Sequence, residues 1–349
     1  MKLIPHKSNS LCRLCSQILP LGRLRSLGQD DRWGGAVPLG RGKGYDNLLL
    51  RDKGQRLCYT VLLKNTRNEV FCVRYDRYAI LTDLDGTLFN SRGEVSRADR
   101  AAIRTFIAGG GLFAVATGRE PRNARRHLPD VPLNGPSICL NGAAVYDFVR
   151  RRYIRAIPMD KDAAQDVLLH CLEMDWPLDL QVYTTDGIYY ASPLDVADPG
   201  FLRIHQPTTC LPMDQLLEKT WIKTVLLERQ VDALAPMRAY LKQKGYDARL
   251  SLVEGTTDVV KIGKYQELLP QDVNKGTGVA EIRKLPVYEG RTLIAVGDYW
   301  NDMELLQAAD VACCPANAID EIKAVCAHVL PSHNEDALAA LVGDVLPRL

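Results

Sequence analysis

The sequence predicts an α/β protein with a doubly wound, mainly parallel sheet as its core and a second α+β domain inserted into it. From residue 78 onwards, short apolar runs alternate with amphipathic segments, a pattern typical of a parallel sheet covered by helices. Several of these runs end in small polar residues, as strands do at the ligand-binding edge of such a sheet. Residues 159–263 are dominated by strand-like runs, which indicates the insertion.

The composition is that of an ordinary soluble protein, and the length of 349 residues predicts roughly two to three domains. No apolar run reaches the roughly 18 residues that a membrane span requires, so we expect no membrane partner. Residues 1–78 carry 15 Lys+Arg against 6 Asp+Glu, a charge of +9, which leaves 29 against 36, or −7, for the remainder. Because phosphate contacts demand a basic surface, the acidic body argues against a nucleic-acid partner.

The 10 cysteines are scattered and mostly lie in apolar runs, which predicts reduced thiols and a cytoplasmic protein. Cys12 and Cys15 have the spacing of half a zinc site, but no second pair follows at a usable distance.

Residues 1–75 are predicted to be a poorly ordered basic extension, because they show no sustained hydrophobic period and are rich in glycine. Three interpretations stay open for this stretch: a disordered tail, a transit peptide, or residues upstream of the native start. The last would need a start codon other than Met, because no methionine lies between Met1 and Met159.

The core is expected to be formed by residues 76–158 and 264–349. In its first part Ser96 caps a helix that a glycine run ends, and 143–158 forms a hairpin. In its second part Lys275 opens a helix. The strands of the core are expected at 78–82, 112–116, 137–140, 292–296, 311–314 and 328–330.

The inserted domain is expected over residues 159–263. Asp186 and Gly187 form a hairpin turn, residues 221–227 a strand, and Gly245 closes a helix over 231–244. We expect a last strand at 258–262 and a long link over 263–272. An inserted domain can open and close over the edge where the polar residues collect.

Asp83 and Asp85 follow the first buried strand, and side chains two residues apart in a strand lie roughly 6.6 Å apart on one face. They can flank one phosphoryl group, with one carboxylate as nucleophile and the other as proton donor. Gly86 lets the backbone turn away from the substrate. The alternative is a strand that ends in an ordinary Asp-Gly turn.

Four polar blocks, each after a strand or at the start of a helix, follow one another along the chain. They are Asp83-x-Asp85-Gly86-Thr87, Thr117-Gly118-Arg119, Lys275-Gly276 and Gly297-Asp298-x-x-Asn301-Asp302. This order resembles the haloacid dehalogenase superfamily of phosphohydrolases, with its Rossmann-like core. The position of the insertion, together with Asn141-Gly142-Ala143, is similar to the Cof-type subgroup, in which the inserted domain is a cap. The resemblance covers residues 76–349.

The resemblance implies a role for each matching residue. Asp83 would attack phosphorus and form an aspartyl phosphate, and Asp85 would donate and then accept a proton. The phosphate would be held by Thr117, Gly118, Asn141, Gly142, Lys275 and Asn301. Mg²⁺ would be bound by Asp83, Asp298 and the backbone carbonyl of Asp85, and Asp302 would support the ion directly or through water.

Electrostatics independently favours a cation at this site. Four carboxylates around a phosphate dianion repel one another, and Lys275 alone does not balance them. Oxygen ligands and a phosphate substrate favour Mg²⁺ over softer metals. A lysine at a helix start also opposes the helix dipole, which favours a functional role for it.

For several other residues the sequence allows both a structural and a functional interpretation. Thr117 merely ends a strand or binds phosphate, and Asn301 caps a helix or helps form the site. Arg119 meets the substrate or pairs with a surface acid. Tyr299 and Trp300 are expected to pack rather than to contact substrate. Cys313 and Cys314 depart from the subgroup's usual Met-Gly-Asn-Ala stretch, and we expect them to be buried as small apolar residues.

The sequence therefore predicts a Mg²⁺-dependent phosphatase that acts on a small phosphorylated metabolite. A phosphomutase uses the same four blocks and is the first alternative. A non-catalytic protein that binds a phosphorylated metabolite is the second. The substrate and the oligomeric state are not determined by these patterns.

Overall fold

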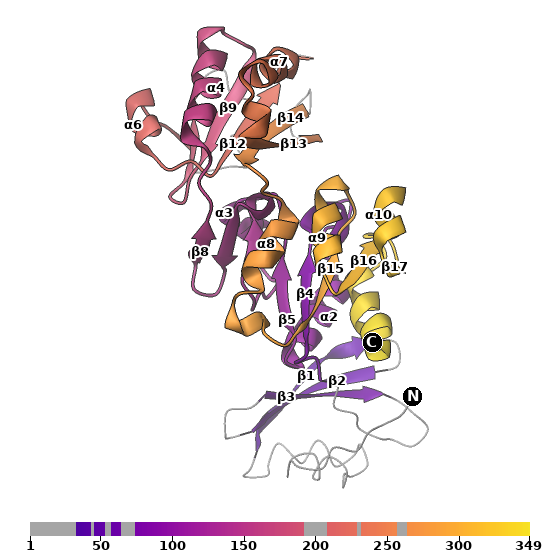
Figure 1. Cartoon of the computed structure of the whole chain (residues 1–349). Coiled ribbons are helices and arrows are strands. Elements are labelled where there is room, and N and C mark those ends of the chain that lie inside the picture. The colour runs from indigo at the N-terminus through magenta and orange to yellow at the C-terminus, as the bar shows by residue number, and fades with distance from the viewer. Residues whose placement is uncertain are drawn as a thin grey trace.

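The computed structural model describes residues 33–42, 45–52, 57–63, 74–191, 208–228, 232–256 and 264–349. Two large sheets dominate these residues: a parallel sheet that forms the core and a mainly antiparallel sheet beyond one end of it (Figure 1). This arrangement confirms the predicted α/β core with an inserted α+β unit. No helix in the described ranges is long and apolar enough to cross a membrane.

The core sheet has the strand order β17-β16-β15-β4-β5, and all its pairings are parallel. Its central strand β4 is buried along its whole length. The strands are β4 (Tyr78–Thr82), β5 (Leu112–Val115), β15 (Thr292–Val296), β16 (Val311–Pro315) and β17 (His328–Leu330).

Helices cover both faces of this sheet, because successive side chains of each strand point to opposite sides. Ile80 packs in a cluster with Phe106 of α2, whereas Leu81 packs in a second cluster with Leu305 of α9. Ser96 caps α2 as predicted, accepting a bond from the Asp99 backbone at 3.0 Å. The helices are α2 (Arg97–Ala108), α8 (Lys275–Ile282), α9 (Met303–Ala308), α10 (Asp320–Val325) and α11 (Ala337–Ala340).

A small sheet of order β6-β7-β8 continues the core beyond β5 through a parallel bridge between Ala116 and Ile138. The antiparallel pair β7 and β8 confirms the hairpin expected over 143–158. The elements of this region are α3 (Pro121–His127), β6 (Ser137–Cys139), β7 (Ala144–Asp147) and β8 (Arg152–Ala156).

The inserted unit, which we call the cap (described residues from 159 to 270), is a sheet of order β11-β10-β9-β12-β14-β13 with helices packed on one face. Asp186 and Gly187 form the turn between β9 and β10, as predicted. The strands are β9 (Leu178–Tyr183), β10 (Ile188–Tyr190), β11 (Thr208–Cys210), β12 (Lys223–Glu228), β13 (Leu250–Thr256) and β14 (Lys264–Pro270). The helices are α4 (Lys161–Glu173), α6 (Met213–Glu218) and α7 (Leu234–Lys244).

The prediction of a link over 263–272 is wrong, because strand β14 lies there and pairs with β12 on one side and β13 on the other. Gln266 and Glu267 are both buried in this strand, so it lacks the polar and apolar alternation by which a strand is recognised. The cap sheet therefore ends at residue 270 instead of 263. The strand expected at 258–262 lies outside the described residues.

The extension before residue 74 contains a three-stranded antiparallel sheet, where the sequence analysis expected no regular structure. Neighbouring antiparallel strands satisfy each other's backbone groups through short connections, and this does not need a clear hydrophobic period. Cys12 and Cys15 lie outside the described residues. The strands are β1 (Trp33–Gly42), β2 (Tyr45–Asp52) and β3 (Leu57–Leu63).

Candidate active site

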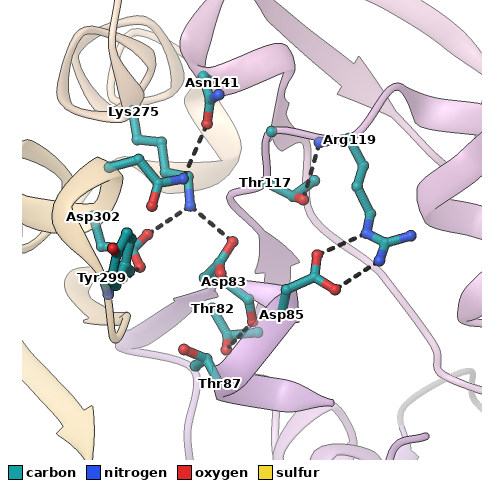
Figure 2. Close-up of polar contacts among 12 residues, drawn as sticks. Thr82, Asp83, Asp85, Thr87, Thr117, Arg119, Asn141, Lys275, Tyr299 and Asp302 are labelled. Carbon is teal, nitrogen blue, oxygen red and sulfur yellow. Dashed lines mark hydrogen bonds and ion pairs between the residues drawn. The ribbon is translucent and has the colours of Figure 1, made fainter. Parts of the chain in front are cut away.

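The four polar blocks meet at the carboxyl edge of the core sheet. β4 ends at Thr82, directly before Asp83, and β15 ends at Val296, two residues before Asp298. Figure 2 shows Asp83, Asp302 and Lys275 pointing toward one another, with Asp85 turned to the other side. The parallel topology thus brings together residues that are more than 200 positions apart in the sequence.

Lys275 is the first residue of α8 and is completely buried between two carboxylates. Its Nζ donates to Asp83 Oδ1 at 2.7 Å and to Asp302 Oδ1 at 2.6 Å (Figure 2). Burial acts to lower the pKa of Lys275, but the two carboxylates outweigh it and hold the pKa above its ordinary value. Lys275 is therefore charged, and it fixes the orientation of Asp83.

Asp83 is nearly buried as well, and burial raises its pKa. The Lys275 ammonium offsets part of this rise, while the nearby carboxylates of Asp302 and Asp298 add to it. A further positive partner would therefore stabilise the carboxylate of Asp83 in this position.

Asp298 completes the acidic cluster, and the Thr87 hydroxyl donates to its Oδ1. Burial is the main cause that raises the pKa of Asp298 to about 6. Gly86 has a φ of +76°, and a Cβ there would overlap Asp298 Oδ2, so glycine is required for this close approach. Asn317 Nδ2 holds the same turn through the Gly86 carbonyl at 2.8 Å.

One oxygen from each of Asp83, Asp298 and Asp302 lies within 4.8 Å of the others. Three carboxylates share one ammonium, so the cluster carries an excess of negative charge in a largely buried position. Hard oxygen donors with excess negative charge suit Mg²⁺. The predicted carboxylates of Asp83, Asp298 and Asp302 therefore fit such an ion, and the backbone carbonyl of Asp85 stays a predicted ligand.

Asp85 pairs with Arg119 through two hydrogen bonds, from Nε at 2.8 Å and from Nη2 at 2.6 Å (Figure 2). The Asp85 side chain is 59% exposed, so a substrate can reach it from solvent. Asn123 accepts a further bond from Arg119 at 2.7 Å, which anchors the guanidinium to α3. Arg119 was expected either to meet the substrate or to pair with a surface acid. It pairs with an acid, but that acid is Asp85, the candidate proton donor.

The predicted phosphate-binding residues border the same cluster. Thr117 is buried, and its hydroxyl accepts the backbone N–H of Arg119 at 3.2 Å. Asn301 Nδ2 donates to Asn141 Oδ1 at 3.3 Å, which joins the Asn141-Gly142 loop to the fourth block. Gly142 has a φ of +102°, and a Cβ there would overlap the Asn274 carbonyl at the start of α8. These contacts fix the loops in place.

Two residues of the cap that the sequence analysis did not single out reach this edge. Lys223 of β12 forms a buried ion pair with Glu267 of β14, and its Nζ donates to the Gly118 carbonyl at 3.0 Å. Glu267 Oε2 accepts from Asn141 Nδ2 at 2.6 Å. The sequence does contain a signal for these two residues, because each is a charged residue in an otherwise apolar strand. Burial of such a charge is costly unless it is paired.

Two smaller expectations are decided by burial. Tyr299 and Trp300 are 53% and 52% exposed, so the prediction that they pack is wrong. They lie in a loop that is held by the Asp302 side chain, whose Oδ2 accepts the Asp298 backbone N–H at 2.9 Å. Their rings point outside this loop. Cys313 and Cys314 are completely buried, as expected.

Comparisons with known proteins agree with this geometry. Residues 80–342 match the model of the haloacid dehalogenase-like hydrolase family. The chain is 24% identical over 298 residues to the 5-amino-6-(5-phospho-D-ribitylamino)uracil phosphatase YwtE of Bacillus subtilis, covering 76% of this chain and 97% of the relative. It is 25% identical over 272 residues, 74% of this chain, to the chloroplastic endoribonuclease YBEY of Arabidopsis thaliana, but it spans only 45% of that protein.

Solved structures show the same fold. The crystal structure of TM0651 from Thermotoga maritima has a TM-score of 0.64 at 19% identity and covers 78% of this chain and 97% of its own. Together with the family match and the four blocks at one sheet edge, these likenesses identify the protein: it belongs to the haloacid dehalogenase superfamily and is a phosphatase of its Cof type.

Proposed function

We propose that this protein hydrolyses small phosphate monoesters with Mg²⁺, through a phosphate ester of Asp83. The observation that carries the proposal is the Asp83 carboxylate, buried and held by Lys275 at the edge where Asp85 lies exposed. A nucleophile and a proton donor are thus presented to one small group from one loop. Phosphoryl transfer otherwise needs mainly positioning and charge neutralisation.

In the first step an Asp83 oxygen attacks phosphorus and the bond from phosphorus to the leaving oxygen breaks. Asp85 gives its proton to that oxygen. In the second step water attacks the aspartyl phosphate, Asp85 takes a proton from the water, and inorganic phosphate leaves with Asp83 restored. Because Arg119 holds both oxygens of Asp85, this pair must loosen as the substrate enters, and Arg119 is then free to contact the substrate.

Asp83 and Asp298 are the residues best able to bind Mg²⁺ directly. Both Asp302 oxygens already accept hydrogen bonds, one from Lys275 and the other from the backbone of Asp298 and Tyr299, so Asp302 would support the ion indirectly. When bound, the ion would neutralise charge on the phosphate and on the nucleophile. The Asp85 carbonyl as a ligand remains a prediction from the family resemblance.

The proposed substrate is a small phosphorylated metabolite, such as a sugar or polyol phosphate. The name of YwtE specifies a phosphorylated ribityl compound, which supports this class. Buried free cysteines, among them Cys139, Cys171 and Cys313, support a reducing, cytoplasmic location. We propose no nucleic-acid or membrane partner.

A phosphate-release assay over a panel of sugar, polyol and cofactor phosphates tests the proposal. We expect release with Mg²⁺, loss of activity with EDTA, and recovery when Mg²⁺ is added back. Conversion of a sugar phosphate to its isomer without phosphate release would indicate the phosphomutase instead. Absence of turnover on the whole panel, by folded protein that still binds the compounds, would support the non-catalytic alternative.

A further inference from the structure

A cavity of about 140 Å³ lies where the core meets the cap. Its walls come from the start of α3, from the hairpin of β7 and β8, and from the turn between β9 and β10. Among the described residues that line it there is no Asp83, Asp85, Lys275 or Asp298. The cavity is therefore distinct from the acidic cluster of the candidate active site.

Two arginines line this cavity, and neither forms an ion pair with another residue that the structure describes. Arg122 makes only a long bond, 3.5 Å, to the Asp186 carbonyl, and Arg151 makes none within the described part of the chain. Neighbouring arginines of the hairpin behave differently, because Arg150 pairs with Asp147 at 2.9 Å and Arg155 with Glu281 at 3.2 Å. Two unpaired guanidiniums in one cavity favour an anionic ligand that both can contact.

The acid in the lining, Glu120, does not satisfy these arginines. Its two carboxylate oxygens accept the backbone N–H groups of Arg122 at 2.8 Å and of Asn123 at 2.6 Å. Burial raises the pKa of Glu120, with these two backbone bonds opposing the rise. The charge of Glu120 also attracts Arg122. With two arginines against this one glutamate, the lining side chains keep a net positive charge.

Tyrosine rings form the remainder of the wall. Tyr146 and Tyr153 meet edge to face, with ring centroids 5.0 Å apart, and Tyr183 closes the cap side. A cavity of about 150 Å³ is large enough for one benzene ring. The space, the rings and the charge therefore match a single aromatic ring that carries one anionic group.

We propose that this cavity binds a small aromatic anion, with its phosphate, phosphonate or carboxylate group held by Arg122 and Arg151 and its ring against the tyrosines. The site is separate from the proposed phosphatase centre and does not depend on it. Because its walls belong to both the core and the cap, a bound ligand stabilises their contact.

Tyr183 connects this site to the catalytic edge. Its ring lies 5.2 Å from Lys223 Nζ, which in turn donates to the Gly118 carbonyl beside Thr117. A ligand that fixes Tyr183 therefore also restrains the cap residue that contacts the second polar block.

The test uses isothermal titration of the whole protein with phenylphosphonate, which has an aromatic ring and a bond from carbon to phosphorus that a phosphatase does not cleave. The variants are R122Q and R151Q. The matched control is R152Q, an exposed arginine beside Arg151 on the same hairpin that does not line the cavity. We expect R122Q and R151Q to weaken one binding event by about tenfold or more, since each removes a charge-assisted bond, and R152Q to keep it.

The same titration with methylphosphonate separates the role of the ring, because it keeps the anion and removes the aromatic surface. Weaker binding to the arginine-dependent site is expected. Phenylphosphonate binding to R122Q and R151Q that equals binding to the parent protein overturns the proposal, whether or not the protein hydrolyses any monoester. Circular dichroism of each variant shows that its fold is intact.

Discussion

The catalytic edge of the core and the facing side of the cap meet at one place but are built differently. At the core edge, each functional side chain stands just after a strand or at the start of a helix, as Asp83, Asp298 and Lys275 do. On the cap, Lys223 and Glu267 lie inside strands of one sheet. The core therefore presents chemistry on loops, whereas the cap presents a preformed surface.

Their charge balance differs as well. The core cluster holds three carboxylates, from Asp83, Asp298 and Asp302, against the single ammonium of Lys275. On the cap, Lys223 and Glu267 balance each other. The excess negative charge thus favours a cation on the core side of the interface and not on the cap side, and the following changes test this difference.

The largest effect is expected from D83N. The amide is nearly isosteric with the carboxylate but is a very poor nucleophile, so turnover should fall on the order of 10⁴-fold or more while the fold is kept. Phosphate release measures the turnover, and circular dichroism measures whether the fold is kept. D320N, at a side chain that is 98% exposed, is the control and should keep full activity. An active D83N would remove Asp83 as the nucleophile.

K275M breaks the core side of the comparison by removing the ammonium that pairs with Asp83 and Asp302. It leaves Asp83 and Asp302 buried and unpaired, which should destabilise the fold by about 3–5 kcal/mol. Activity should fall about 10²- to 10³-fold, because the nucleophile loses its orientation. Chemical unfolding with and without Mg²⁺ measures the first effect, and the ion should recover part of the loss. Unchanged stability would show that the carboxylates do not need this partner.

K223M breaks the cap side. It leaves Glu267 without its cation and removes the bond to the Gly118 carbonyl, so closure of the cap should weaken. We expect about a tenfold loss in kcat/KM, smaller than for K275M, since Lys223 does not touch the nucleophile. K219M is the matched control, because Lys219 pairs with Asp186 on the cap surface. Equal effects of K223M and K219M would contradict a role for the cap contact.

D99N measures what burial alone does to a carboxylate of the core. Burial raises the pKa of Asp99 to about 6, with the backbone bond from Ala339 at 2.8 Å opposing the rise. A folded-state pKa above the unfolded value means that the fold favours the protonated carboxyl of Asp99. The stability that the protonated group contributes is therefore present below about pH 4 and is lost as pH rises through 6. The free energy of unfolding of D99N relative to the parent should therefore rise by about 2 kcal/mol between pH 4 and pH 7. A pH-independent difference would show that Asp99 does not titrate in this range.

Much of the core was predictable because its signals are local. The apolar run before Asp83, the capping pair of Ser96 and Asp99, and the glycine at position 86 each depend on residues within a few positions of one another. The four blocks were predicted to gather, since parallel strands end at a common edge. Arg119 was singled out, but its pairing with Asp85 depends on where the loop of α3 places its guanidinium.

The cap contacts were not predictable in the same way. β14 was taken for a link because Gln266 and Glu267 are polar. Burial of Glu267 in a strand is made acceptable only by Lys223 in the same sheet and Asn141 across the interface. The three-stranded sheet before residue 74 was missed because its pairing, not a hydrophobic period, defines it.

The sequence by itself determined the fold class, the insertion and the residues of the acidic cluster, because strand patterns and the residues at strand ends are written in contiguous segments. Tertiary structure alone decided which partners those residues have. Lys275 lies between Asp83 and Asp302, Asp85 faces Arg119, and Glu267 bonds Asn141 only after two sheets are placed together. Such contacts join residues tens to hundreds of positions apart, and their burial, which gives them their strength, exists only in the folded chain.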